Sequence, residues 1–507
     1  MGPHSEIEEQ TIADMQQRMA AGEMTAQQLL GVYLDRIEQL DRQGPELRSI
    51  IELNPDAMEI AAELDRERRE RGPRGALHGI PILLKDNIDT ADKMTTTAGS
   101  LALEGSHPLQ DAFVTQRLRE AGAIIVGKAN LSEWANFRSS HSSSGWSGRG
   151  GQGKNPFVLD RSPCGSSSGS GQSVSANLIA AAIGSETDGS IVCPSHTNGI
   201  VGIKPTVGLV SRAGIIPISY SQDTAGPMAR TVADAAAVLG AIAGVDPRDA
   251  MTAASAGKSF ADYTKFLDKD GLKGARIGVV REVYSGYSRE ADAIVEQALQ
   301  ALRDLGAVIV DPADIPTAAE MKSTDVEFQV MLYEIKAGLK AYFAALGPDA
   351  PLRTLEDLIV FNEKHADREM QYFGQDQLLL AQEKGPLTEQ AYLDALATSH
   401  RLSRGQGIDA VMNEHNLDAL IAATGAPSWP IDLVNGDHYV GSSSTPAAMA
   451  GYPLISVPAG YAFGLPVGLT FMGRAYSEPT LIRLAYAFEQ ATNVRRAPQF
   501  LPTAPTS

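Results

Sequence analysis

The sequence contains little of what would indicate a disulfide-rich, metal-binding or membrane protein. Its 507 residues include two cysteines, Cys164 and Cys193, which supply neither a disulfide framework nor a metal-ligand spacing. No apolar run reaches the length of a membrane span. The first residues, MGPHSEIEEQ, lack the basic and then apolar regions of a signal peptide. We therefore expect a cytoplasmic protein as written, or a periplasmic or secreted one if a leader has been removed.

Basic residues are also scarce. The 43 Lys and Arg residues are outnumbered by 61 Asp and Glu residues, which gives a net charge of −18. A surface that binds phosphate groups needs a basic excess. We therefore expect neither nucleic acid nor membrane among the main partners.

The histidines offer no clear catalytic pairing. None of the nine lies in a setting that pairs it with a serine, and the nearest candidates, His107, His141 and His196, are interpreted as loop histidines. The H-E-x-x-H zinc motif is absent. The sequence thus predicts no metal site.

Segments with helical spacing of apolar residues alternate with short apolar runs along the chain. This alternation predicts an α/β protein. The stretch 315–410 is nearly all helical in pattern and rich in charge, which indicates an inserted helical layer. We expect helices at 11–40, 57–70, 112–121, 174–183, 231–243, 290–305 and 478–489, and strands at 79–89, 124–126, 274–280, 307–310, 417–424 and, as a strand pair, 464–473.

Lys85 closes an apolar strand, GIPILLKDNID. An isolated lysine in this position is usually a surface residue where the strand meets solvent. The alternative is a buried lysine whose charged form is disfavoured by desolvation, so that it can accept a proton.

Residues 139–175 are dense in serine and glycine. A flexible linker is one interpretation. However, Trp146 and the apolar residues 157–159 interrupt the segment, which favours an ordered functional loop. A phosphate-binding loop is a further alternative, but the Gly-Lys-Ser/Thr ending and the dinucleotide fingerprint are missing.

Ser190 lies in the turn ETDGSIVCP. A serine in a tight glycine-containing turn can present its hydroxyl beside a row of backbone N–H groups, which is what an oxyanion needs. The surroundings are not the G-x-S-x-G elbow of α/β-hydrolases, so an Asp-His triad is not predicted. A plain turn is the simpler alternative.

Together these segments resemble the amidase signature family. The resemblance is carried by GIPILLKDN, PCGSSSGSG, GSETDGSIVCP, GIVGIKPTVGLVS and SQDTAGPMARTVADAA, with Ser190 placed 24 residues after Ser166, and it extends through NLSEWANF, GWSGRGGQGKNP, AGYPLISVPAG and GLPVGLTFMG. It covers nearly the whole chain. It implies a single domain over residues 1–507, with a central mixed twisted sheet flanked by helices on both faces.

The resemblance also implies a catalytic triad. Ser190 becomes the acyl nucleophile, Ser166 a bridging serine that follows a non-proline cis peptide bond, and Lys85 the base that takes the proton through Ser166. The N–H groups of Thr187, Asp188, Gly189 and Ser190 become the oxyanion hole. Cys164 and Asp188 stand where the family usually has glycine, and these departures bear on the substrate rather than on the chemistry.

A serine hydroxyl is a weak nucleophile until a base removes its proton, and a lysine kept neutral by burial can be that base. The implied reaction is hydrolysis of a carboxamide C–N bond through an acyl-enzyme, without cofactor or metal. The substrate expected first is a C-terminal peptide amide, or a small or aryl amide. We predict substrate contacts from Ser140, Ser142 and Trp146, with residues 315–410 as a helical cap beside the pocket.

Other functions remain open. The same triad would attack a carbamate (urethane), an anilide or an ester. An amidotransferase subunit that supplies ammonia to a charged tRNA would need partner subunits and a tRNA surface, which the net charge disfavours. A non-catalytic scaffold that binds a ligand through its Ser/Gly loop is disfavoured by the presence of Lys85, Ser166 and Ser190 together. The chain is expected to be a monomer or a homodimer.

Overall fold

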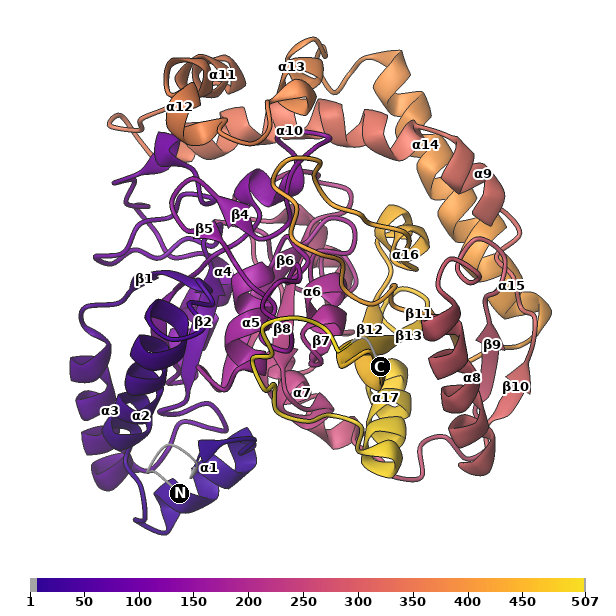
Figure 1. Ribbon diagram of the computed structural model, residues 1–507, viewed down its shortest axis with the longest axis horizontal. Coiled ribbons are helices and arrows are strands. Elements are labelled where there is room, and N and C mark those ends of the chain that lie inside the picture. Colours follow the sequence, from indigo (N-terminus) through magenta and orange to yellow (C-terminus); the bar gives the residue numbers. More distant parts are fainter. Residues whose placement is uncertain (1–6, 506–507) are drawn as a thin grey trace.

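The computed structural model describes residues 7–505; residues 1–6, which include part of the N-terminal segment used for the leader expectation, and residues 506–507 lie outside this part. Its centre is a mixed sheet of 11 strands in the order β1-β3-β2-β6-β8-β7-β12-β13-β11-β9-β10 (Figure 1). The strands are β1 (Ile50–Leu53), β2 (Pro81–Lys85), β3 (Ile124–Ala129), β6 (Ala181–Glu186), β7 (Val201–Lys204), β8 (Thr224–Ala229), β9 (Arg276–Val279), β10 (Val308–Val310), β11 (Ala419–Ala423), β12 (Leu454–Ala462) and β13 (Leu465–Met472).

Both parallel and antiparallel pairs occur in this sheet. Strand β2 runs parallel to β3 and β6, and β9 runs parallel to β10 and β11. The other neighbouring pairs are antiparallel. A short separate ribbon pairs β4 (Trp146–Ser147) with β5 (Gly151–Gln152) inside the Ser/Gly segment, so this segment is ordered.

Helices cover both faces of the sheet, as β13 illustrates. A Cβ at Gly468 would lie 3.3 Å from the Cβ of His196 on α6, whereas the ring of Phe471 packs on Phe488 of α17. Residues separated by an odd number along a strand face opposite sides, so α6 and α17 lie on opposite faces. The helices of the body are α1 (Ile12–Ala20), α2 (Ala26–Arg36), α3 (Ala57–Arg71), α4 (Phe113–Glu120), α5 (Ser168–Ser175), α6 (Val192–Thr197), α7 (Val232–Ile242), α8 (Arg289–Asp304), α16 (Thr445–Ala450) and α17 (Glu478–Thr492).

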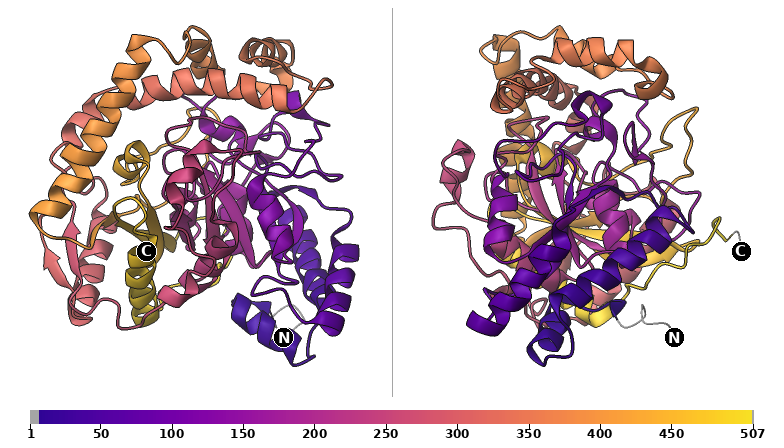
Figure 2. Two further views of the ribbon diagram at one scale, coloured as in Figure 1. Left: turned by 180° about the vertical axis from the view of Figure 1, so that it is seen from behind. Right: turned by 90° about the vertical axis from the view of Figure 1, so that its left-hand side faces the viewer.

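A helical layer separates β10 from β11 in the sequence. Figures 1 and 2 show it as the orange helices above the body and along one side of it. None of the helices in the described part is long and apolar enough to cross a membrane. The layer consists of α9 (Ala318–Ser323), α10 (Val326–Ala345), α11 (Leu355–Lys364), α12 (Ala366–Glu369), α13 (Asp376–Gln382), α14 (Gln390–Ser403) and α15 (Asp409–Glu414).

Three of the predicted elements are wrong. The segment 174–183, predicted as one helix, is the end of α5 followed by the start of β6. The strand β6 is central in the sheet and buried throughout its length. Such strands read as continuous apolar runs without alternation, which a helix segment can also show. The strand pair predicted within 464–473 is one strand, β13, whose partner is β12. The single helix predicted at 11–40 is also divided, between α1 and α2.

Candidate active site

Lys85 is the last residue of β2, and its side chain has no exposed surface. Its Nζ lies 2.7 Å from Ser166 Oγ, 2.9 Å from Ser185 Oγ and 3.1 Å from the Ser185 carbonyl oxygen. Burial lowers the pKa of Lys85 to about 7, against the opposing effect of the negative charges of Asp223 and Glu186. A neutral amine here can donate to both Ser185 oxygens and keep its lone pair for the Ser166 hydroxyl proton.

Ser166 lies in the loop that leads into α5, after a cis peptide bond between Gly165 and Ser166. A Cβ at position 165 would lie 2.0 Å from Ser132 Oγ, so any other residue there would force the Ser132 hydroxyl to move. The Ser132 N–H donates to the Ser166 carbonyl oxygen at 3.1 Å, and the Ser167 N–H donates to the Ser190 carbonyl oxygen at 3.1 Å. These bonds hold the Ser166 loop beside the Ser190 loop.

Glu186, at the end of β6, organises the Ser190 turn. Its carboxylate accepts the N–H groups of Gly189, Ile191 and Val192 at 2.9, 2.7 and 3.0 Å. Gly189 has a φ of +80°, which explains the glycine before Ser190. Of the four N–H groups predicted to form an oxyanion hole, that of Gly189 is therefore directed to Glu186. Those of Thr187, Asp188 and Ser190 make no hydrogen bond within residues 7–505.

The side chain of Asp188 connects the Ser190 turn to two other parts of the fold. It accepts hydrogen bonds from the hydroxyls of Ser444 and Thr445, where α16 begins, and it contacts Glu327 of α10. Gln222 donates to Glu327 at 2.8 Å. Burial raises the pKa of Asp188, and burial together with the Asp188 charge raises that of Glu327 well above its usual value. The charge of Asp188 thus opposes ionisation of Glu327.

Two cavities flank the three predicted triad residues. The Ser190 cavity, of about 570 Å³, is lined by Ser190, Gly189, Asp188 and Gly165. The Ser166 cavity, of about 560 Å³, has polar groups on its floor and a largely apolar wall. The floor includes Ser166, Ser185, Thr187 and Asn87, and the wall includes Ile216, Pro217, Ile218, Ala341 and Leu346.

The predicted substrate-contact residues lie in two different places. Ser140 and Ser142 line the Ser190 cavity. Trp146 is buried and packs edge-on against Tyr372 and Phe373, with ring centroids 5.7 and 5.2 Å away. It is not one of the residues that line either cavity in the described part of the chain.

Two aromatic residues that the sequence reasoning missed line the Ser190 cavity. These are Trp429 and Tyr439, and their rings stack edge-on at 5.4 Å. The Trp429 indole N–H donates to Asp437 at 3.0 Å. The segment SWPIDLVNGDHYV carries no pattern that would have indicated this role, because the residues reach the cavity only through the tertiary fold.

The three candidate histidines differ in their surroundings. His196 is buried between the Ala426 carbonyl oxygen and the Gly468 N–H, and burial lowers its pKa to about 4. His107 contacts the Met94 carbonyl oxygen at 3.1 Å. His141 lines the Ser190 cavity, and its Nδ1 lies 3.0 Å from Ser140 Oγ. His141 is thus the histidine that a rival base assignment would have to use.

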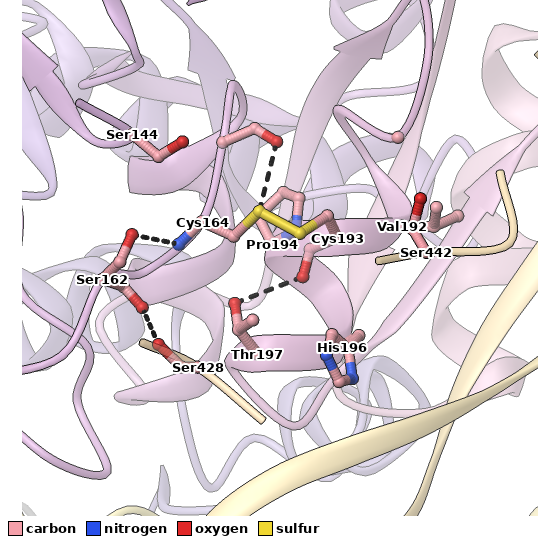
Figure 3. Close-up of a disulfide and its surroundings, with 12 residues drawn as sticks. Ser144, Ser162, Cys164, Val192, Cys193, Pro194, His196, Thr197, Ser428 and Ser442 are labelled. Atoms are coloured by element: carbon pink, nitrogen blue, oxygen red, sulfur yellow. Dashed lines mark hydrogen bonds between the residues drawn. A yellow bond between two sulfur atoms is a disulfide. The ribbon is translucent and has the colours of Figure 1, made fainter. Parts of the chain in front are cut away.

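The two cysteines form a disulfide, Cys164–Cys193 (Figure 3). Sequence reasoning found no framework in two cysteines, although one signal was present: Cys164 precedes Ser166 by two residues, and Cys193 follows Ser190 by three. Within the described residues, no three His, Cys, Asp or Glu side chains come together as metal ligands would.

Known proteins resemble this chain over almost its full length. The family model Amidase matches residues 28–482. The crystal structure of native peptide amidase from Stenotrophomonas maltophilia superposes with a TM-score of 0.94 at 54% identity, covering 98% of this chain and 100% of that one. A probable amidase of Arabidopsis thaliana is 44% identical over 98% of this chain and 92% of its own length. A glutamyl-tRNA(Gln) amidotransferase subunit from Chloroflexus aurantiacus is 34% identical over 96% of this chain and 98% of its own length.

Proposed function

Because this chain belongs to the amidase signature family and is a hydrolase of carbon–nitrogen bonds, we propose that it cleaves carboxamides with a triad of Ser190, Ser166 and Lys85. The observation that carries the proposal is the buried contact between Lys85 Nζ and Ser166 Oγ at 2.7 Å. A lysine with a pKa of about 7 is half neutral at that pH and can act as a base.

In the proposed reaction, Lys85 takes the Ser166 proton while Ser166 takes the Ser190 proton. The Ser190 oxygen then attacks the substrate carbonyl, and the N–H groups of Thr187, Asp188 and Ser190 stabilise the oxyanion. The proton returns through Ser166 to the leaving nitrogen, so that ammonia or an amine departs. Water then attacks the acyl-enzyme by the same proton route and releases the acid.

The substrate proposed is a C-terminal peptide amide, or a similar small or aryl amide. The likeness to peptide amidase at 54% identity supports it, and so do two cavities large enough for an acyl group of several residues. Ser140, Ser142 and the helical cap of residues 315–410 would contact this acyl group. Trp146 and its ring partners Tyr372 and Phe373 line neither of these two cavities, so a substrate contact from Trp146 lacks this support.

Carbamates, anilides and esters are the alternative substrates, since the same nucleophile attacks their carbonyl groups. An amidotransferase role has less support, because the amidotransferase relative is 34% identical whereas peptide amidase is 54% identical. The disulfide favours an oxidising compartment, such as a periplasmic or secreted location, over the cytoplasm. The protein is proposed to act as a monomer or homodimer.

A hydrolysis screen tests the proposed function. Peptide amides, anilides, carbamates and esters with matched acyl groups would be incubated with the protein and with Ser190→Ala, and the products read by mass spectrometry. We expect release of the free acid from peptide amides by the native chain only. Hydrolysis of carbamates alone would move the assignment to that class, and equal product from Ser190→Ala would refute the triad.

A further inference from the structure

The Cys164–Cys193 disulfide joins the two loops that carry the proposed triad serines. Cys164 belongs to the loop of Ser166, and Cys193 belongs to α6, which begins directly after the Ser190 turn. Both cysteines also line the Ser190 cavity, with 4% and 6% of their surface exposed. Figure 3 shows the bridge between the two segments, beside Thr197 and Pro194.

Hydrogen bonds tie the same two segments on either side of the bridge. The Ser167 N–H donates to the Ser190 carbonyl oxygen at 3.1 Å. The Pro163 carbonyl oxygen accepts from Thr197 Oγ1 at 2.8 Å and from Asn198 Nδ2 at 2.9 Å. The disulfide links the same two segments covalently, at a point between these hydrogen bonds.

Apolar packing gives this contact little support. The residues after Cys164 are Gly165 and a run of serines, which have almost no apolar surface to bury. The two cysteines form a small apolar cluster with Trp429, separate from the main core. Without the bridge, the Ser166 loop is held against α6 mainly by hydrogen bonds, each of which stabilises a contact only modestly.

We propose that the Cys164–Cys193 disulfide is a positioning element of the catalytic site, which holds Ser166 and Ser190 at the separation that proton transfer requires, and that a thiol reductant entering the Ser190 cavity lowers turnover. The inference rests on the proposed triad. Its physical basis is that misplacement of a reacting group by about 1 Å costs about 100-fold in rate. Substrate contacts made elsewhere in the cavities depend less on this spacing, so kcat falls more than KM rises.

The reduction is a thiol–disulfide exchange. The thiolate of a dithiol such as dithiothreitol attacks one sulfur of the bridge and forms a mixed disulfide, while the other cysteine sulfur leaves as a thiolate and takes up a proton. The second thiol of the reagent then displaces the first cysteine. The products are two protein thiols and one cyclic oxidised reagent. The reagent supplies both electrons.

The chain is suited to this test because Cys164 and Cys193 are its only cysteines. The native chain would be assayed oxidised, reduced by dithiothreitol, and reoxidised, with iodoacetamide labelling to count free thiols. The double variant Cys164→Ser/Cys193→Ser cannot form the disulfide and serves as the permanently unbridged form. Oxidised protein treated with iodoacetamide alone is the control. Near-UV circular dichroism reports the folded fraction in each sample, and fluorophosphonate labelling of Ser190 reports nucleophile reactivity without a substrate.

We expect reduction to lower kcat and the Ser190 labelling rate by about tenfold or more, with KM changed by less than about threefold. Reoxidation restores kcat and the labelling rate. The double variant has the same kcat and labelling rate as the reduced chain, and dithiothreitol does not change them. Unchanged kcat in protein that carries two free thiols would overturn the proposal. So would a loss of activity that follows the loss of folded protein in proportion. Oxidised protein that neither hydrolyses amides nor labels at Ser190 would instead refute the proposed function.

Discussion

The Nζ of Lys85 lies 2.7 Å from the Oγ of Ser166, and neither side chain has exposed surface. The amine thus bonds to a hydroxyl rather than to a carboxylate, while the negative charges of Asp223 and Glu186 favour its charged form. Burial then dominates and lowers the pKa of Lys85 to about 7. The burial of Lys85 in the fold thus gives it the lowered pKa that a base needs.

Replacement of Lys85 tests its role as a base. Lys85→Ala should lower kcat by about 1,000-fold, the middle of the range of about 100- to 10,000-fold for loss of a general base. Lys85→Arg should not restore it, because arginine stays protonated. Steady-state kinetics on a peptide amide measures both. Lys154→Arg, at a partly exposed lysine in the Ser/Gly segment, is the control and should behave as the native chain. Near-native rates in Lys85→Arg would show that position 85 needs only positive charge.

The pH dependence follows from the direction of the Lys85 shift. Lysine is neutral above its pKa, so kcat/KM should be level at alkaline pH and fall through about pH 7, by about tenfold per unit below it. The variants His107→Ala, His141→Ala and His196→Ala should keep this acid limb in place. The result from His141→Ala is the most informative, because His141 lines the Ser190 cavity. Loss of the limb in that variant, with folding intact, would move the base to histidine.

We expect turnover to depend on the hydrogen bonds made by the Asp188 and Glu327 side chains rather than on the ionisation of Glu327. Glu327→Gln keeps a side chain that can bond to both Asp188 and Gln222, so kcat should stay within about threefold of native. Glu327→Ala leaves the Asp188 carboxyl without this neighbour beside the Ser190 turn, and kcat should fall by about tenfold. Kinetics of the two variants side by side decides the point. An equal loss in both would show that the ionisable group itself is required.

The Ser166 cavity should take the bulky apolar part of a substrate. Ala341 of α10 lines it, so Ala341→Phe should lower kcat/KM on amides with large apolar acyl groups by about tenfold while small amides change little. Ala344→Phe, on an exposed part of the same helix that does not line the cavity, is the matched control. Equal effects of Ala341→Phe on small and large amides would place the acyl group elsewhere.

The sequence predicted the α/β class, six of the 11 strands of the sheet and the segments that carry Lys85, Ser166 and Ser190. These three residues were found because they sit in long local motifs. The sequence did not predict β6 correctly, since the first four residues of this strand, AAIG, are apolar on both faces and lack the alternation of a half-buried strand. It also missed Trp429, Tyr439 and the Cys164–Cys193 pairing. For Trp429 and Tyr439, nothing in the local pattern indicates a place in the cavity, whereas for the cysteines the one signal was their position beside Ser166 and Ser190.

The central claim is that Ser190 is the nucleophile and that Lys85 activates it through Ser166. The most direct measurement is fluorophosphonate labelling of the native chain and of Ser190→Ala, Ser166→Ala and Lys85→Ala, with the modified residue located by peptide mass spectrometry. The account predicts a single adduct on Ser190, none in Ser190→Ala, and labelling slowed by about 100-fold or more in the other two variants. An adduct on another serine, or labelling of Ser190 at the native rate in Lys85→Ala, would contradict it.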